Sequence, residues 1–170
     1  MLLSYRPRYL SKALNLGVFI RVRTSFIRFL NRVNDPTNKE CCNSKDYEKW
    51  GWSPGAIYKV LLAENTGGKC PKYLGFALYY FTYSTWTGHP TLWLEDLFVP
   101  EELRGNGIGS TLLRKLARIA LDKGCARMEW TVLDWNEPSR KFYYGLGAKS
   151  MDEWTTFRLT QTEIRKLAEN

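Results

Sequence analysis

The residues best suited to chemistry in this sequence form a short run rich in glycine. An arginine is followed by three glycines at alternate positions, in the run Arg104-Gly105-Asn106-Gly107-Ile108-Gly109-Ser110. Glycines let the backbone approach a ligand closely, and a following helix adds unpaired N–H groups and the positive end of its dipole. The guanidinium of Arg104 supplies a permanent cation with planar donors. The run therefore predicts a pyrophosphate site, although a plain strand-to-helix turn would use similar glycines.

Two familiar nucleotide-binding loops do not fit this run. A Walker loop ends in Gly-Lys-Ser/Thr, whereas this sequence has Gly109-Ser110-Thr111 without the lysine. The dinucleotide fingerprint is G-x-G-x-x-G, whereas the spacing here is G-x-G-x-G behind an arginine. The neighbouring elements must therefore decide what the loop binds.

A strand and a helix flank the loop. An apolar strand is expected over residues 92–99, ending at Pro100, and a helix over residues 110–123. The apolar face of that helix consists of Leu112, Leu113, Leu116 and Ala120. Gly124 follows where a left-handed residue commonly ends a helix. This arrangement holds the glycines between two rigid elements.

A second polar motif, Asn136-Glu137-Pro138-Ser139, begins another short helix. Asn136 is suited to cap it and Pro138 to lie in its first turn. Phe142, Tyr143 and Leu146 share one face, and Gly147 closes the helix.

The remaining pattern predicts a mixed sheet. Strands are expected over residues 58–64, 73–83, 127–133 and 154–159, and a capping box at Thr160–Glu163 begins a terminal helix. The first two strands suggest an antiparallel hairpin. The strands on either side of helix 110–123 should be parallel neighbours. The fold class is therefore α/β (α+β), with a mostly antiparallel central sheet and flanking helices.

Composition limits the classes of function. The chain has 170 residues, of which 44% are hydrophobic and 15% aromatic, so one globular domain is expected. No apolar run reaches the roughly 20 residues of a membrane helix, so no membrane partner is expected. The four cysteines form no CxxC pair, which argues against a zinc site and a disulfide framework. No metal is expected.

The positive charge is concentrated in residues 1–34, which contain seven arginines and lysines and no acid. The rest of the chain has 18 basic against 17 acidic residues, which argues against a nucleic-acid surface on the domain. The segment 1–34 fits either a mitochondrial transit peptide or a degenerate first strand and helix. The expected location is cytoplasmic, or mitochondrial if the segment is a transit peptide.

In their order and spacing, the two polar motifs resemble the GCN5-related N-acetyltransferase (GNAT) superfamily. Three further runs resemble its diamine branch, which includes spermidine/spermine and thialysine N-acetyltransferases. They are Tyr79-Tyr80-Phe81-Thr82-Tyr83, Leu94-Glu95-Asp96 and Val132-Leu133-Asp134-Trp135-Asn136. The match extends from about Tyr58 to the C-terminus, and the N-terminal third departs from it. The resemblance implies an acyl-CoA N-acyltransferase fold over residues 35–170.

The resemblance also implies acetyl-CoA as the acyl donor. It assigns the pyrophosphate to Arg104, Gly105, Asn106, Gly107, Ile108, Gly109 and Ser110, and the pantetheine arm to Leu97, Phe98 and Val99. It assigns further CoA contacts to Asn136, Glu137, Pro138, Ser139 and Tyr143. A homodimer is a further implication.

The chemistry requires a base and an acid. An alkylammonium has a pKa of about 10, so a nearby carboxylate must take its proton before it can attack a thioester. Glu95 is the candidate base and Tyr143 the candidate acid for the CoA thiolate, with Tyr144 as a weaker rival. The resemblance places Glu95, Asp96, Glu129, Trp130 and Thr131 near the amine. The alternative is that the carboxylates are ordinary strand residues and Tyr143 is core.

The sequence thus predicts an N-acetyltransferase that transfers acetyl from acetyl-CoA to a primary amine of a small diamine, polyamine or amino-acid-like substrate. Direct attack in a ternary complex is the expected route. A protein or peptide N-acetyltransferase and a non-catalytic acyl-CoA-binding module are the alternatives.

Overall fold

The computed structural model describes residues 9–10, 44–65 and 73–169. The chain forms two compact units, Met1–Thr131 and Val132–Asn170, and each is described by itself. Most of the basic segment 1–34 lies outside the described residues. The sequence also predicts a loop at 35–38 and a turn at 65–68, and of these residues only Asn65, the last residue of β2, is described. None of the described helices is long and apolar enough to cross a membrane.

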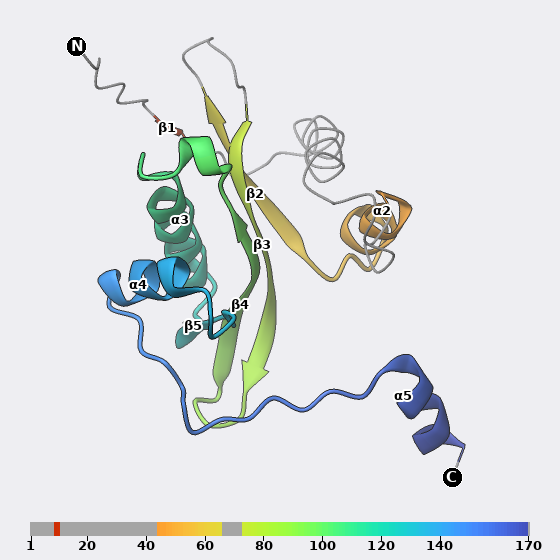
Figure 1. Cartoon of the computed structure of the whole chain (residues 1–170). Helices are drawn as coiled ribbons and strands as arrows, with labels where there is room; N and C mark the ends of the chain where they lie inside the picture. The colour runs from red at the N-terminus through yellow and green to blue at the C-terminus, as the bar shows by residue number, and fades with distance from the viewer. Residues whose placement is uncertain (1–8, 11–43, 66–72, 170) are drawn as a thin grey trace, which may run out of the picture. The chain divides into compact units, whose positions relative to one another are not determined.

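The first unit contains a five-stranded sheet in the order β1-β2-β3-β4-β5 (Figure 1). The strands are β1 (Tyr9–Leu10), β2 (Lys59–Asn65), β3 (Tyr73–Ser84), β4 (His89–Phe98) and β5 (Arg127–Glu129). Neighbouring strands are antiparallel except β4 and β5, which are parallel. The predicted mixed, mostly antiparallel sheet with a parallel pair around the central helix is therefore confirmed.

Helix α3 (Ile108–Asp122) covers one face of this sheet (Figure 1). It begins two residues before the predicted start, and its apolar stripe is buried as expected, with Leu112 and Leu116 fully inaccessible. Leu92 of β4 is also fully buried. Burying each such leucine stabilises the fold by about 2 kcal/mol. Gly124 has φ 74° and ends the helix in the predicted left-handed conformation.

Helix α2 (Ser44–Trp52) packs on the opposite face (Figure 1). The cluster under it consists of Val60, Leu62, Phe76 and Leu78, with Tyr47, Trp52, Tyr58, Tyr73 and Phe98 packed against it. The run Trp50-Gly51-Trp52-Ser53-Pro54-Gly55 predicts a break in the chain. That prediction is wrong for its first three residues, which form the last turn of α2. Gly51 permits this, because any Cβ there would lie 2.4 Å from Cζ of Tyr58.

A β-bulge interrupts the pairing of β3 and β4. Leu78 pairs with Asp96 and Tyr79 pairs with Leu94, so Glu95 is an extra residue without a partner on β3. The parallel pairing of β4 with β5 ends at Trp93, two residues earlier. The prediction of a strand over residues 127–133 was therefore wrong in length, because β4 is redirected by the bulge where the ladder would continue.

The second unit contains α4 (Glu137–Gly145) and α5 (Gln161–Ala168) and no strand. Asn136 caps α4, Pro138 lies in its first turn, and the capping box of α5 forms, all as predicted. The strand predicted over residues 154–159 is absent. A strand needs a hydrogen-bonded neighbour, and residues 132–169 supply none.

Gly75 of β3 lies against the end of β4, which leads into the glycine-rich loop. A Cβ at this position would lie 2.5 Å from the backbone oxygen of Phe98, an atom that cannot move alone. We expect Gly75→Ala to lower the free energy of unfolding by about 1–3 kcal/mol. The thermal midpoint should fall by about 2–8 °C in calorimetry.

Gly145→Ala is the matched control, because nothing lies within 4 Å of a Cβ there. This change should leave the midpoint unchanged or raise it slightly. Equal effects of the two substitutions would contradict the close approach of β3 and β4.

Candidate active site

The bulge in β4 presents two adjacent carboxylates at the surface. Glu95 is the unpaired residue, and Asp96 resumes the ladder with Leu78. Bulges re-aim side chains and are common beside active sites. Both predicted amine-facing carboxylates therefore lie where β4 changes direction.

Glu95 is held by two donors that the sequence did not reveal. Its Oε2 accepts a hydrogen bond from the Tyr80 hydroxyl at 3.2 Å and another from Trp93 Nε1 at 3.0 Å. Tyr80 and Trp93 are paired across β3 and β4. Side chains alternate between the two faces of a strand, so the sequence alone places Trp93 and Glu95 on the same face. That Tyr80 lies beside them depends on the register between β3 and β4.

Asp96 keeps access to solvent, yet neighbouring atoms desolvate its carboxyl group. Burial raises the pKa of Asp96, and the negative charge of Glu95 raises it further. The two carboxylates therefore favour binding a proton or a cation at this point of the sheet.

Beyond the bulge, β4 is paired with β3 but no longer with β5. Leu97 and Phe98 pair with Ala77 and Phe76 of β3, whereas the pairing with β5 has already ended at Trp93. The ring of Phe98 stacks on that of Phe76, with centroids 5.9 Å apart, which anchors the strand end. The pairing on the β5 side of β4 ends at Trp93, before Leu97 and Val99. An extended ligand can add amide pairs along such a strand.

The glycine-rich loop has the geometry of an anion cradle. Gly105 and Gly107 have φ values of 77° and 75°, and nothing lies within 4 Å of a Cβ built on either. Gly107 caps α3, whose first-turn N–H groups at Ile108, Gly109 and Ser110 have no partner inside the helix. No acidic residue lies in that first turn to oppose an anion. These features fit the diphosphate of acetyl-CoA.

Side chains around the loop fix its shape. The short 3-10 helix Glu101–Leu103 leads into it. Arg104 Nε donates to the backbone oxygen of Val99 at 3.1 Å, and Asn106 Nδ2 donates to that of Leu103 at 3.1 Å. The remaining guanidinium donors of Arg104 are left for a ligand, since the residue is exposed.

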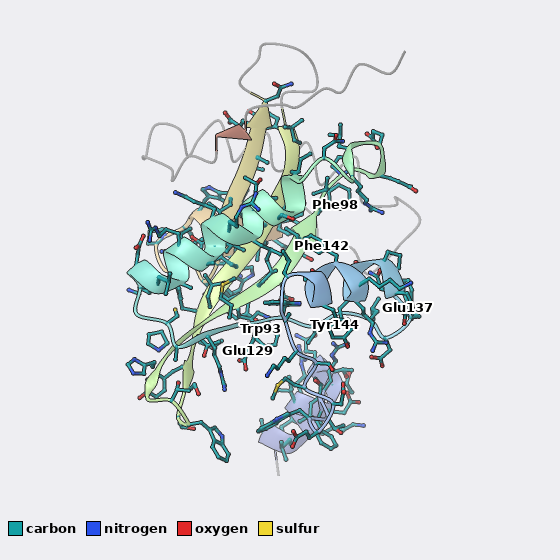
Figure 2. All side chains as sticks on the ribbon, turned by 90° about the vertical axis from the view of Figure 1, so that its left-hand side faces the viewer. Trp93, Phe98, Glu129, Glu137, Phe142 and Tyr144 are labelled. Carbon is teal, nitrogen blue, oxygen red and sulfur yellow. The ribbon has the colours of Figure 1, made fainter. Side chains whose placement is uncertain are left out.

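Glu129, Trp130 and Thr131 lie at the end of β5. Trp93 and Glu129 are register partners and lie side by side in Figure 2. The carboxylate of Glu129 is 3.0 Å from Arg127 Nε. Its charge is therefore partly neutralised, which distinguishes it from Glu95 and Asp96.

The second unit brings together the other predicted residues. Asn136 Oδ1 accepts from the backbone N–H of Ser139 at 3.3 Å, in the turn that carries Glu137 and Pro138. Tyr143 follows on α4, with its ring centroid 5.3 Å from that of Phe142.

Tyr143 and its rival Tyr144 differ in environment. Burial raises the pKa of Tyr143, so its hydroxyl stays protonated at neutral pH. Hydrogen bonds from Ser150 and Arg140 lower the pKa of Tyr144. Because burial keeps the hydroxyl of Tyr143 protonated, whereas the pKa of Tyr144 is lowered, Tyr143 is the better candidate for an acid.

The chain matches the model of the acetyltransferase (GNAT) family over residues 27–148. The matched region begins inside the basic segment 1–34. The chain therefore belongs to the GNAT family and is an acetyl-CoA-dependent N-acetyltransferase that acts on amines.

Its relatives match the predicted diamine branch. The thialysine N-epsilon-acetyltransferases of Bos taurus and Sus scrofa are 41% and 46% identical over 125 and 127 residues. Each alignment covers 69% of this chain and 73% of the relative. The spermidine/spermine N(1)-acetyltransferase-like protein 1 of Homo sapiens is 36% identical over 124 residues, or 69% of this chain and 18% of that protein.

Solved structures share the fold. An integron cassette protein from the mobile metagenome of V. cholerae has a TM-score of 0.74 at 26% identity, covering 95% of this chain and 98% of that one. The aminoglycoside N-acetyltransferase AAC(6')-Iy in complex with CoA has a TM-score of 0.69 at 20% identity, covering 94% and 99%.

The raised pKa of Asp96 makes a prediction about stability. A carboxyl group with a raised pKa in the fold favours the protonated form, so its contribution is present below the ordinary value of 3.8. That contribution is lost as pH rises through the raised value. Asp96→Asn cannot ionise and should therefore raise the thermal midpoint at pH 7.

The gain from Asp96→Asn should disappear at a pH below 3.8, where the wild-type carboxyl is protonated in both states. Thermal melts of the ligand-free protein at several pH values give the comparison. A gain that is equal at all pH values would show that packing, not ionisation, is responsible.

Proposed function

We propose that this enzyme acetylates a primary amine of a small diamine, polyamine or amino-acid-like molecule. The observation that carries the proposal is the position of Glu95 and Asp96. They lie at the bulge of the strand that continues past its pairing with β5 and leads into the glycine-rich loop. Carboxylates at this point suit a cationic substrate beside the donor thioester. The names of the most similar relatives support the same class of amine.

Acetyl-CoA binds along β4 and the loop in this proposal. The pantetheine amides pair with the backbone of Leu97–Val99, and the diphosphate accepts bonds from the N–H groups of residues 105–110 and from Arg104. The motif Asn136–Ser139 of the second unit supplies further contacts. The fixed donors of the loop require little reorganisation when the anion binds.

The transfer is a direct attack in a ternary complex. Glu95 takes a proton from the ammonium group, through a water, and thereby frees the nitrogen lone pair. The nitrogen attacks the thioester carbonyl carbon, so that a C–N bond forms and the C–S bond breaks. Tyr143 donates its proton to the departing thiolate. The second proton lost by the nitrogen restores the Tyr143 hydroxyl, and Glu95 passes its proton to solvent. The products are the N-acetyl amine, the CoA thiol and one proton.

Substrate selection follows from charge. Asp96 is the nearest neighbour of Glu95 and favours a second cationic group on the substrate. Trp130 and Thr131 complete the side of the pocket next to β5, and Glu129 contributes less because Arg127 pairs with it. The homodimer, the cytoplasmic location and the domain boundary at residue 34 stay predictions.

A panel of amines tests this proposal directly. The purified chain is incubated with acetyl-CoA and with spermidine, thialysine, lysine, ornithine or lysine-containing peptides, and release of the CoA thiol is followed. Small amines with two cationic groups should react with the highest kcat/KM. Preference for peptides would instead support the protein or peptide N-acetyltransferase. No release with any amine by the folded protein would contradict the proposal.

Tyr143→Phe tests the acid. The substitution removes one hydroxyl and should lower kcat by about 10²-fold or more, because a positioned proton donor contributes that much. The KM for acetyl-CoA should change by less than about threefold, since ring packing is retained. Steady-state kinetics with the preferred amine measure both values.

Tyr144→Phe is the matched control on the same helix and should keep most of the turnover. A larger loss in this variant would transfer the acid role to Tyr144. Parallel loss of turnover and acetyl-CoA affinity in Tyr143→Phe would argue for a structural role.

A further inference from the structure

Tyr80, Trp93 and Glu95 form a cross-strand cluster on the sheet face that also carries the register partner of Trp93, Glu129 (Figure 2). The two aromatic rings lie 6.5 Å apart with a tilt of 34°. The Tyr80 hydroxyl and Trp93 Nε1 both donate hydrogen bonds to the same carboxylate oxygen, Oε2 of Glu95. The other oxygen, Oε1, accepts no hydrogen bond from the described residues.

We propose that Tyr80 and Trp93 are positioning residues that hold Oε2 of Glu95 and direct its other oxygen, Oε1, to the incoming amine. The inference rests on the proposed role of Glu95 as base. It adds two residues that do not touch the reacting atoms and act only through the carboxylate.

The bulge explains why such donors are needed. Glu95 has no partner on β3, so the backbone ladder does not fix the direction of its side chain. A free glutamate would sample several rotamers. Two bonds from rings held in paired strands restrict Oε2, and this restriction determines where Oε1 lies.

The local charges give the donors a second effect. Asp96 on β4 repels the charge of Glu95, Tyr80 is the facing titratable group on β3, and the Arg127–Glu129 pair is the neighbour on β5. Hydrogen bonds to a carboxylate favour its charged form. Burial, the charge of Glu95 and the hydrogen bond to it raise the pKa of Tyr80, so this phenol remains a donor at neutral pH.

The test compares Tyr80→Phe, Trp93→Phe and the double variant with the wild type, using the amine preferred in the panel. The acid limb of the kcat/KM profile should move to higher pH in each, and furthest in the double variant. Turnover on that limb should fall about tenfold for each unit of displacement. The KM for acetyl-CoA should be unchanged. An acid limb that stays in place would overturn the inference.

Two controls lie on the same hairpin. Tyr83 and Trp86 are 67% and 84% exposed and neither bonds to Glu95. Tyr83→Phe and Trp86→Phe should leave the profile unchanged. A shift as large as that of Tyr80→Phe would overturn the inference, because it would show a general effect of the hairpin. If Trp93→Phe lowers the thermal midpoint severely, the test depends on Tyr80→Phe alone. That substitution removes one hydroxyl from a half-buried ring and should leave the fold intact.

Glu95→Gln separates the inference from the proposed function. Wild-type turnover with an intact acid limb in this variant would remove Glu95 as base. Loss of the limb in Glu95→Gln, together with an unmoved limb in Tyr80→Phe and Trp93→Phe, would overturn only the positioning role.

Discussion

One extra residue in β4 determines how this site is built. Up to Trp93, the strand is hydrogen-bonded on both sides, to β3 and to β5. At Glu95 the register with β3 shifts by one, and no pairing with β5 follows. The same strand therefore acts first as an interior strand and then as an edge. Exposed edges are normally a hazard, because they recruit other strands. In this enzyme the strand end lies directly before the glycine-rich loop, and the proposed binding of acetyl-CoA uses both.

The glycine-rich loop depends on the strand end that the bulge creates. Phe98 is tied to the core by its stacking on Phe76, and Val99 accepts the hydrogen bond from Arg104. The loop therefore begins at a fixed point and ends at the N-terminus of α3, which is buried through Ile108. Between these anchors, Gly105 and Gly107 adopt positive φ values that other residues would find strained. Because both ends of the loop are held in place, the fold itself sets the directions of the loop's backbone N–H groups.

Local patterns were enough to predict the elements whose stability is local. The period of the leucines defined α3, the capping residues defined the starts of α4 and α5, and aromatic strands defined the β2–β3 hairpin. The wrong predictions concern segments whose structure depends on residues distant in the sequence. β5 stops early because β4 turns away, α2 continues to Trp52 because Gly51 accommodates the Tyr58 ring, and residues 154–159 have no strand to pair with. Glu95 could be named as a candidate, but its donor Tyr80 is 15 positions away and depends on the register.

The charge balance at the bulge connects binding to chemistry. Two adjacent carboxylates repel each other, and the raised pKa of Asp96 is the sign of that repulsion together with burial. Tyr80 and Trp93 donate hydrogen bonds to Glu95, so the two carboxylates have different surroundings. A cation that binds there relieves the repulsion, and an ammonium group also carries the proton that must be removed before attack. In the proposed mechanism, the attraction that selects a cationic amine therefore acts at the carboxylate that deprotonates it. For such a site, a neutral analogue of the substrate would lose binding and reactivity together, because both rely on one local excess of negative charge.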